Sequence, residues 1–468
     1  MKHLHLLYTL LFGVAVLLFF GLAYPHHLHY QEQYQLFLFD SNYVWEIVRH
    51  PGGVADLLGR FCTQFFLYAW VGALIIALLL SAVQLLTLRL LNGQCSMFNV
   101  QSSIFNVQWS YGLSFVPSFL LWLFLLDENA LMGGVWAVLL TQLTVLGYVL
   151  LPKGWTGRIV ILVTLPVLYF LVGPSWSGSH YHRYPTVTPY LLYAAWLSAI
   201  VLPLVLRIGR KWMSASKSFA VTFCSFALVF AIMGSLVWKN ANFKAEKVMQ
   251  YDFMVCHQQW NRIIEAINAE KPNNQIGVTV QNLALAMHGM LLDHMFDYNQ
   301  NGILGLLPDV NTDATSPLPT AEAFYQLGMI NVAQRTVFEA QEAILDFQKS
   351  GRCYKRLAQT NLINGRYEVA RKYLTALQKT LFYRDWANET LLLLGDEAAI
   401  ARHPEYGHLR KWAYKENFYF SDHVTPEMLE RLYFSNTDNR MAYQYLVAYY
   451  MLTGDREGYN KFMSTIKR

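Results

Sequence analysis

Apolar residues dominate the first half of the chain in long uninterrupted runs, and in the second half they recur at helical spacing instead. A run of about 20 apolar residues is long enough to cross a membrane as a helix. The first half therefore predicts about seven membrane-spanning helices, of which the fifth and sixth rest on the shortest runs. The runs are Leu4–Ala23, Phe65–Leu90, Ile104–Leu126, Leu131–Leu151, Ile159–Val172, Tyr190–Leu206 and Phe219–Trp238. No small-residue cleavage site follows the first run, so we expect it to be retained as a helix.

The second half alternates apolar and polar positions in a way that predicts stacked helical hairpins. Leu357–Lys379 places Gly365, Tyr367, Ala370 and Tyr373 as in the tetratricopeptide pattern, with small residues where helices touch. Further copies follow at Phe324–Ile344, Tyr251–Ile267, Val280–His294 and Met441–Ile466. The predicted fold is therefore all-α: a polytopic bundle over residues 1–238 and a tetratricopeptide-like α-solenoid over residues 239–468.

Grooves of such repeat arrays bind peptides or proteins, although some arrays serve only as spacers. Tyr325, Tyr367 and Tyr373 are large side chains of the two clearest copies. We expect them to line a groove for a partner or acceptor protein.

The charges separate the two halves in the same way and predict an orientation. The chain is 54% hydrophobic and 14% charged, and most charged residues follow residue 238. Basic residues concentrate in cytosolic loops of membrane proteins. With the N-terminus in the cytosol, only Arg49, Arg60 and Arg183 lie in outer loops. The inner side then carries Lys2, Arg89, Lys153, Arg158, Arg207, Arg210, Lys211 and Lys217.

This orientation predicts a bacterial inner-membrane protein whose C-terminal half lies in the periplasm, although a eukaryotic lumenal domain would give the same pattern. The net charge of +5 is explained by these orienting residues and does not indicate nucleic-acid binding.

All acidic residues of the first half also fall on the outer side. Either they were excluded from the hydrocarbon region or they form an outward-facing acidic site. They are Glu32, Asp40, Glu46, Asp56, Asp127 and Glu128.

The first predicted outer loop, residues 24–64, is long and partly apolar. Charged residues interrupt its apolar runs too often for a span, which is typical of helices lying in the membrane interface. Asp40 follows the apolar run Leu36–Phe39 and precedes a helical pattern. It is expected either to cap that helix or to take part in chemistry. The pattern of this loop therefore predicts that it contacts membrane lipid.

The third predicted outer loop, residues 173–189, brings a cationic group together with aromatic residues. Its His180, His182 and Arg183 suit a phosphate at the headgroup level. Aromatic residues at this level are also ordinary components of the interface belt, so both interpretations stay open. The aromatic residues are Trp176, Tyr181 and Tyr184.

Two acidic motifs carry a resemblance to a known family. Asp40 and Tyr43 lie in the outer loop after the first helix, and Asp127 and Glu128 lie between the third and fourth helices. This arrangement resembles the membrane glycosyltransferases of the C-type fold, including the oligosaccharyltransferase catalytic subunits. Those enzymes share a seven-helix module followed by an outward soluble domain. The chain departs from them in its very short second loop. It is also similar to a bacterial membrane family that combines such a module with helical repeats.

The resemblance implies transfer of a glycan from a polyprenyl-phosphate-linked donor to an acceptor on the outer side, for which a protein is one candidate. It implies a catalytic group of Asp40, Glu32 and Tyr43, with Asp40 as general base or metal ligand. Asp40, Asp127 and Glu128 would hold a divalent cation, Mg²⁺ or Mn²⁺, against the leaving phosphate. Arg183, with His180 and His182, would bind the donor phosphate.

Motifs for nucleotide binding and common hydrolases are absent: the chain has no GxGxxG after a strand, no GxxxxGK[ST], no GxSxG and no HExxH. This agrees with a donor delivered through the membrane. The alternative is a non-catalytic, membrane-anchored repeat scaffold for secretion or envelope assembly, in which the carboxylates are solvated loop residues. A phosphate ligand beside Arg183 distinguishes the two hypotheses.

Overall fold

The computed structural model describes residues 4–92, 112–150, 155–173, 181–184, 186–208, 219–309, 317–344, 348–416 and 425–466. The chain divides into two compact units, Met1–Glu246 and Lys247–Arg468. All regular structure in the described residues is helical, apart from one isolated antiparallel bridge between Ala130 and His182. The all-α prediction is therefore confirmed.

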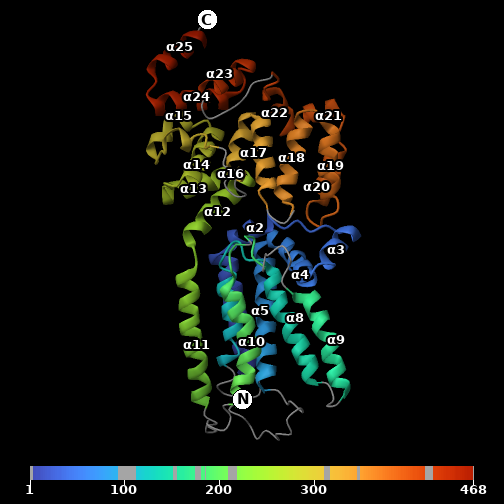
Figure 1. Ribbon diagram of the computed structural model, residues 1–468. Coiled ribbons are helices and arrows are strands. Elements are labelled where there is room, and N and C mark those ends of the chain that lie inside the picture. Colours follow the sequence, from blue (N-terminus) through green and yellow to red (C-terminus); the bar gives the residue numbers. More distant parts are fainter. Residues whose placement is uncertain are drawn as a thin grey trace. The chain divides into compact units, whose positions relative to one another are not determined.

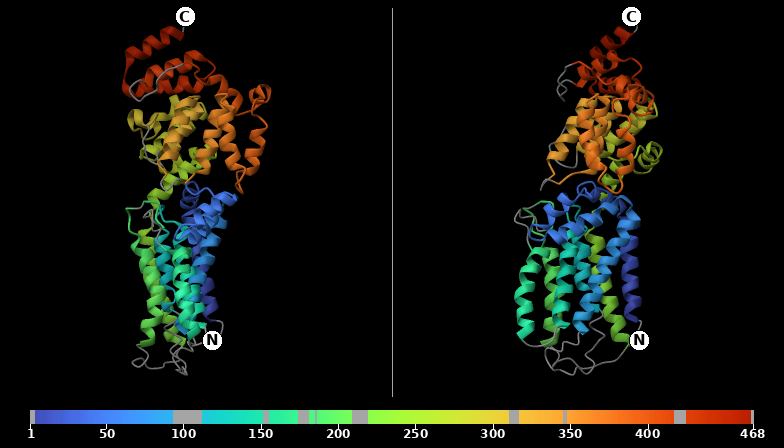
Figure 2. Two further views of the ribbon diagram at one scale, coloured as in Figure 1. Left: turned by 45° about the vertical axis from the view of Figure 1, so that its right-hand side comes forward. Right: turned by 90° about the vertical axis from the view of Figure 1, so that its right-hand side faces the viewer.

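The long helices of the first unit run side by side, and shorter helices gather at one end of them (Figures 1 and 2). The long helices are α1 (Leu4–Leu18), α5 (Ala69–Asn92), α8 (Met132–Leu150), α9 (Trp155–Val172), α10 (Tyr190–Ile208) and α11 (Phe219–Asn240). A π-helical turn, Phe19–Ala23, extends α1. The shorter helices at that end are α2 (Pro25–Glu32), α3 (Ser41–Val48), α4 (Gly53–Thr63) and the 3-10 turn Gln64–Leu67, whereas α7 (Val116–Phe124) packs within the bundle on α5, α10 and α11.

By length and composition, three helices in the described residues are able to cross a membrane. They are His5–Ala23, Ala69–Leu91 and Phe223–Asn240, and two shorter apolar helices are Met132–Gly147 and Tyr190–Val201. This is fewer than the seven spans predicted. The third predicted span is not among the three, because its residues 104–111 lie outside the described residues. α9 and α10 each contain a proline, Pro166 and Pro203, and both helices continue past it.

The helices of the first unit contact one another through polar as well as apolar side chains. Thr9 donates to Gln84 at 2.8 Å, Gln84 donates to Ser114 at 2.8 Å, and Gln142 donates to Thr87 at 2.8 Å. Such interhelical hydrogen bonds are favourable where no water is present. Large apolar side chains on the outer faces are exposed instead, among them Leu10, Leu78, Val163, Leu197 and Leu228. The buried core between the helices is mainly apolar and includes these few hydrogen-bonded polar groups, while apolar side chains also cover the outer faces.

The loop end of the first unit, defined here as residues 24–64, 127–130 and 181–184, is closely packed. α4 packs against α8 and α9, and the contact depends on glycine. A Cβ at Gly59 would lie 2.3 Å from the backbone nitrogen of Gly133, so only glycine allows these helices to approach. Residues 33–38, which connect α2 to α3, are all buried.

The boundary between the units lies after Glu246, later than the predicted boundary at residue 238. α12 (Phe243–Cys256) follows α11 after two non-helical residues. The backbone N–H of Asn242 donates to the Tyr24 hydroxyl at 3.0 Å, and Glu246 bonds to the start of α2. These contacts attach the first turn of α12 to the first unit, although its composition is polar.

The second unit is a succession of helices that pack mainly on their neighbours in sequence, including α16 on α17, α17 on α18 and α18 on α19. Its helices are α13 (Trp260–Glu270), α14 (Gln275–Met287), α15 (Leu291–His294), α16 (Pro317–Leu327), α17 (Ile330–Glu342), α18 (Gly351–Ile363), α19 (Tyr367–Leu377), α20 (Arg384–Leu391), α21 (Glu397–Arg402), α22 (Tyr406–Trp412), α23 (Thr425–Ser435), α24 (Arg440–Thr453) and α25 (Arg456–Ile466), with 3-10 turns at Met295–Asp297 and Gly302–Gly305.

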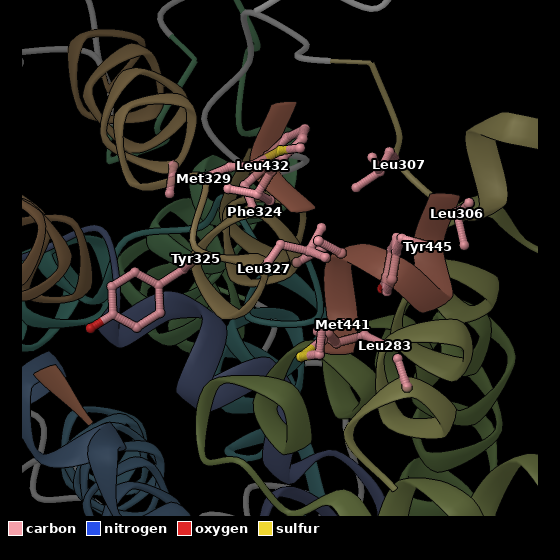
Figure 3. Packing of buried hydrophobic residues seen from close by; sticks show 14 of the residues in the cluster. Leu283, Leu306, Leu307, Phe324, Tyr325, Leu327, Met329, Leu432, Met441 and Tyr445 are labelled. Atoms are coloured by element: carbon pink, nitrogen blue, oxygen red, sulfur yellow. The ribbon is translucent and has the colours of Figure 1, made fainter. Parts of the chain in front are cut away.

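Figure 3 shows the main core of this unit, in which Leu283 of α14, Phe324 and Leu327 of α16 and Tyr445 of α24 are buried together. The clearest predicted repeat forms α18 and α19, joined by a turn in which Gly365 has φ +72°. The helical nature of the repeats is thus observed, and their tetratricopeptide arrangement stays a prediction.

Candidate functional site

Two loops that are far apart in sequence are joined at the loop end. Ala130 and His182 form an antiparallel bridge. The backbone N–H of Arg183 donates to the Asn129 carbonyl at 2.9 Å, and that of Leu131 donates to the Tyr181 carbonyl at 2.9 Å. The second and third predicted outer loops therefore form one structure, which brings the predicted acidic pair next to the predicted phosphate-binding residues.

His182 and Asp127 form a hydrogen-bonded pair within this structure. Nδ1 of His182 lies 3.1 Å from both the backbone nitrogen and the carbonyl oxygen of Tyr184. Nε2 lies 3.0 Å from Oδ2 of Asp127. Burial acts to raise the pKa of Asp127, but the hydrogen bonds from His182 and from the backbone of Asn129 outweigh it and lower that pKa. Asp127 is therefore ionised at neutral pH, and 45% of its side chain is exposed.

Arg183 is buried, with 8% of its surface exposed. Its guanidinium carbon lies 3.4 Å from the centre of the Tyr34 ring and 5.3 Å from that of Tyr30. Nη1 donates to the Tyr30 hydroxyl at 3.4 Å, whereas the buried Nε has no hydrogen-bond partner. No ion pair within the described part of the chain includes Arg183. A buried cation without a carboxylate is costly, and an anionic ligand would relieve that cost.

α2 supplies the aromatic wall of this site and holds the acidic loop. Tyr30 lies in its last turn, and Tyr34 follows shortly after its end. Nε2 of Gln31 donates to the Ala130 carbonyl at 3.1 Å. α2 thus contacts both joined loops, and the position of Arg183 depends on where α2 lies.

Asp40 and Tyr43, predicted as catalytic, have structural contacts. Oδ1 of Asp40 accepts from the backbone N–H groups of Asn42 at 3.0 Å and Tyr43 at 3.2 Å, so Asp40 is the N-cap of α3. The Tyr43 hydroxyl donates to the Leu36 carbonyl at 3.1 Å. The capping alternative for Asp40 is therefore confirmed.

The predicted metal ligands are not assembled into a site. Within the described ranges, no group of three or more His, Cys, Asp or Glu side chains could hold a metal ion. Asp40 uses an oxygen as a helix cap, and both oxygens of Asp127 accept hydrogen bonds. The divalent cation at Asp40, Asp127 and Glu128 therefore stays a prediction that no cluster in these ranges supports. Glu32 is buried at the end of α2, and His180 lies outside the described residues.

The three predicted groove residues of the second unit do not share one surface role. Tyr325 is fully buried and donates to Glu405 at 2.9 Å, so it cannot line an open groove. This part of the prediction is wrong, because Tyr325 lies within a buried ionic cluster. Tyr367 donates to Glu397 and accepts from Arg410, and Tyr373 packs against Tyr354. Tyr367 and Tyr373 are both partly exposed.

Sequence reasoning missed the two tyrosines that hold Arg183. Tyr30 and Tyr34 are four residues apart, the spacing at which side chains of one helical face come together. That spacing was the available signal. It is weak in a chain containing 29 tyrosines, and their pairing with Arg183 across 153 positions cannot be read from periodicity.

Comparison with known proteins gives one match. The model of a family described as a family of unknown function (DUF6057) matches residues 1–177 and 172–468. No curated protein matches the chain, and no solved structure does. An activity therefore has to be argued from the site itself.

Proposed function

The chain belongs to the DUF6057 family, and we propose that it is a membrane glycosyltransferase or oligosaccharyltransferase. It would take a glycan from a polyprenyl-phosphate carrier on the outer face of the inner membrane. The observation that supports this is Arg183, a buried guanidinium stacked on Tyr34 that lacks a carboxylate partner within the described ranges. Arginine binds phosphate oxygens in a planar fork, and it suits such a site better than lysine.

In the proposed reaction, the bond between the anomeric carbon and the carrier phosphate oxygen breaks, and its electrons remain on the phosphate. Arg183 offsets the negative charge that develops there. The acceptor oxygen or nitrogen forms the new bond to the anomeric carbon and gives up its proton. Asp127 replaces Asp40 as the proposed proton acceptor, because it is ionised and half exposed, whereas Asp40 caps a helix.

The proposal includes about seven spans, with a cytosolic N-terminus and a periplasmic second unit. α7, α8, α9 and α10 pack on one another or on α5, which supports placing them in the same bundle. The distribution of basic residues supports the orientation. The second unit would be a tetratricopeptide-like solenoid that binds a protein or peptide. The consecutive packing of α16 to α19 and the buried Ala370 and Leu374 support this.

Transfer in proteoliposomes tests the function. Wild-type protein is expected to release polyprenyl phosphate from a fluorescent glycan donor and to label an acceptor present on the outer side. Arg183→Gln should lower the rate by about 10²–10³-fold, the usual cost of one charge-stabilising donor. Arg49→Gln, at an exposed arginine of the same end, is the matched control. Equal transfer by wild type and Arg183→Gln would contradict the proposed role.

A non-catalytic scaffold is the second candidate, and one observation favours it. Asp40 and Tyr43, the residues nearest to the enzyme pattern, both make structural contacts. A wild-type protein that neither binds nor turns over any polyprenyl-phosphate glycan would support the scaffold.

A further inference from the structure

Glu246 bonds to the beginning of α2 from the far end of the first unit's sequence. Its Oε1 accepts from the backbone N–H of His26 at 2.8 Å, and its Oε2 accepts from that of His27 at 2.9 Å. The side chain is buried, with 7% of the residue exposed. Burial raises the pKa of Glu246 to about 7, although these two hydrogen bonds lower it.

This contact supplies a cap that α2 does not have locally. The N-cap residue, Tyr24, makes no side-chain capping bond. A helix of eight residues is too short to be stable without such support. The free N–H groups at a helix start attract a carboxylate, and here one carboxylate satisfies two of them.

α2 in turn carries contacts to the Arg183 site. Its Tyr30 accepts from Arg183, and its Gln31 donates to the Ala130 carbonyl beside the bridge to His182. A loss of order at the start of α2 would therefore weaken the contacts that hold both joined loops, residues 127–130 and 181–184.

We propose that Glu246 is a positioning residue for the Arg183 site, acting by fixing the N-terminus of α2. The structural part of this inference, that Glu246 fixes α2 and the two joined loops, rests on the contacts alone. The functional part, that this affects binding of a polyprenyl phosphate, rests on the proposed function. Glu246 does not itself touch the ligand.

Hydrogen–deuterium exchange of the full chain without ligand tests the structural part. Glu246→Gln keeps the side-chain shape but offers one acceptor oxygen instead of two. Above pH 7, where Glu246 is ionised, we expect the amides of His26 and His27 to exchange about tenfold faster in the variant, because one loses its acceptor and the other loses a charge-assisted bond. Faster exchange is also expected at Leu131 and Arg183, whose N–H groups join the two loops. Glu270→Gln, which removes an exposed pairing with Lys247, is the control.

Binding of decaprenyl phosphate in nanodiscs tests the functional part. Glu246→Gln should weaken binding about tenfold in the wild-type background. In an Arg183→Gln background the same change should have no further effect, because the interaction it supports is already gone. A general loss of stability would lower binding in both backgrounds. Glu246→Asp keeps the charge and should restore part of the affinity, and it serves if Glu246→Gln does not fold.

The outcomes are distinguishable. Unchanged exchange at Leu131 and Arg183 in Glu246→Gln would overturn the positioning role, whether or not any ligand binds. Equal weakening in both backgrounds would overturn it as well. A wild-type protein that does not bind decaprenyl phosphate, but whose loops lose protection in Glu246→Gln, would overturn the proposed function and leave the positioning of the loops established.

Discussion

Each unit of the molecule contains a buried arginine stacked on a tyrosine, and the two differ in their counter-ions. In the first unit, Arg183 lies 3.4 Å from the Tyr34 ring centre. In the second, Arg356 lies 3.7 Å from the Tyr325 ring centre. Arg356 is 2.5 Å from Glu322 and 3.8 Å from Glu405, whereas Arg183 forms no ion pair in the part of the chain described.

The difference separates a structural cation from one available to a ligand. Glu322 also approaches Arg352 at 3.5 Å, and Arg352 bonds to Asp252 at 2.6 Å, so the charges of the second cluster are neutralised within the chain. Such a cluster holds helices α12, α16 and α18 together, but it has no unpaired positive charge that could bind an anionic ligand. The first site has the same stacking without the carboxylates, which is why an anion is expected there.

The largest effect is expected from breaking the neutralised cluster. Glu322→Gln removes the buried carboxylate that both arginines contact, and it leaves Arg356 with only the more distant Glu405, at 3.8 Å. The variant should lose about 3 kcal/mol or more of unfolding free energy, as when one partner of a buried pair is removed. Chemical unfolding in detergent, followed by circular dichroism, measures this. Glu339→Gln, which breaks a more exposed pair with Arg335, should stay within about 0.5 kcal/mol. Similar small losses for both would remove the distinction between the clusters.

The second effect is a change in the stability of the first unit with pH, caused by the buried Glu246. The pKa of Glu246 is raised to about 7 in the folded state, above its usual value of 4.5. A raised carboxyl pKa means that the folded state holds the proton more tightly. The stability from this group is therefore present at low pH and is lost as pH rises from about 4.5 to 7. The loss amounts to roughly 3 kcal/mol.

The difference in unfolding free energy between wild type and Glu246→Gln isolates this contribution. Wild type should lose stability relative to the variant between pH 5 and pH 8. A difference that does not change with pH would contradict the raised pKa of Glu246 in the folded state.

A smaller effect is expected at Asp40, which separates capping from chemistry. Asp40→Ala removes the cap of α3 and should cost about 1 kcal/mol of stability. Asp40→Asn retains a good cap and should change stability and transfer little. Loss of transfer by Asp40→Asn with unchanged stability would return Asp40 to the catalytic group.

The smallest expected effect on stability is that of Arg183 itself. Arg183→Gln removes a buried cation that lacks a carboxylate partner in the described ranges, and it should change the unfolding free energy by less than about 1 kcal/mol. Arg356→Gln, the counterpart in the second unit, should be clearly destabilising because it removes the nearest cation from the buried Glu322. Equal losses would mean that both arginines are structural.

Local patterns predicted the local structure well. The helical spacing around Gly365 predicted the turn between α18 and α19, and Asp40 at the end of an apolar run predicted a cap. Asp127, His182 and Arg183 were each predicted to act on the donor phosphate, but no direct contact between the loops that carry them was predicted. Their joining depends on a backbone bridge between positions 130 and 182, which no periodicity records.

The remaining errors have similar causes. Tyr325 was predicted on a groove because residue type and repeat position do not reveal that Glu405, 80 positions later, covers it. Glu246 was not singled out, because a single acidic residue after a span is ordinarily solvated. Its burial depends on contact with the N-terminus of α2, which lies about 220 positions earlier in the chain.

Equilibrium binding of decaprenyl phosphate to the protein in nanodiscs tests the central claim most directly. Wild type and Arg49→Gln should bind with similar affinity, and Arg183→Gln should bind at least about 100-fold more weakly, equivalent to about 2.7 kcal/mol. Arg183→Lys should be intermediate, since it keeps the charge without the planar fork. Undiminished binding by Arg183→Gln would contradict the assignment of Arg183 as the phosphate-binding residue.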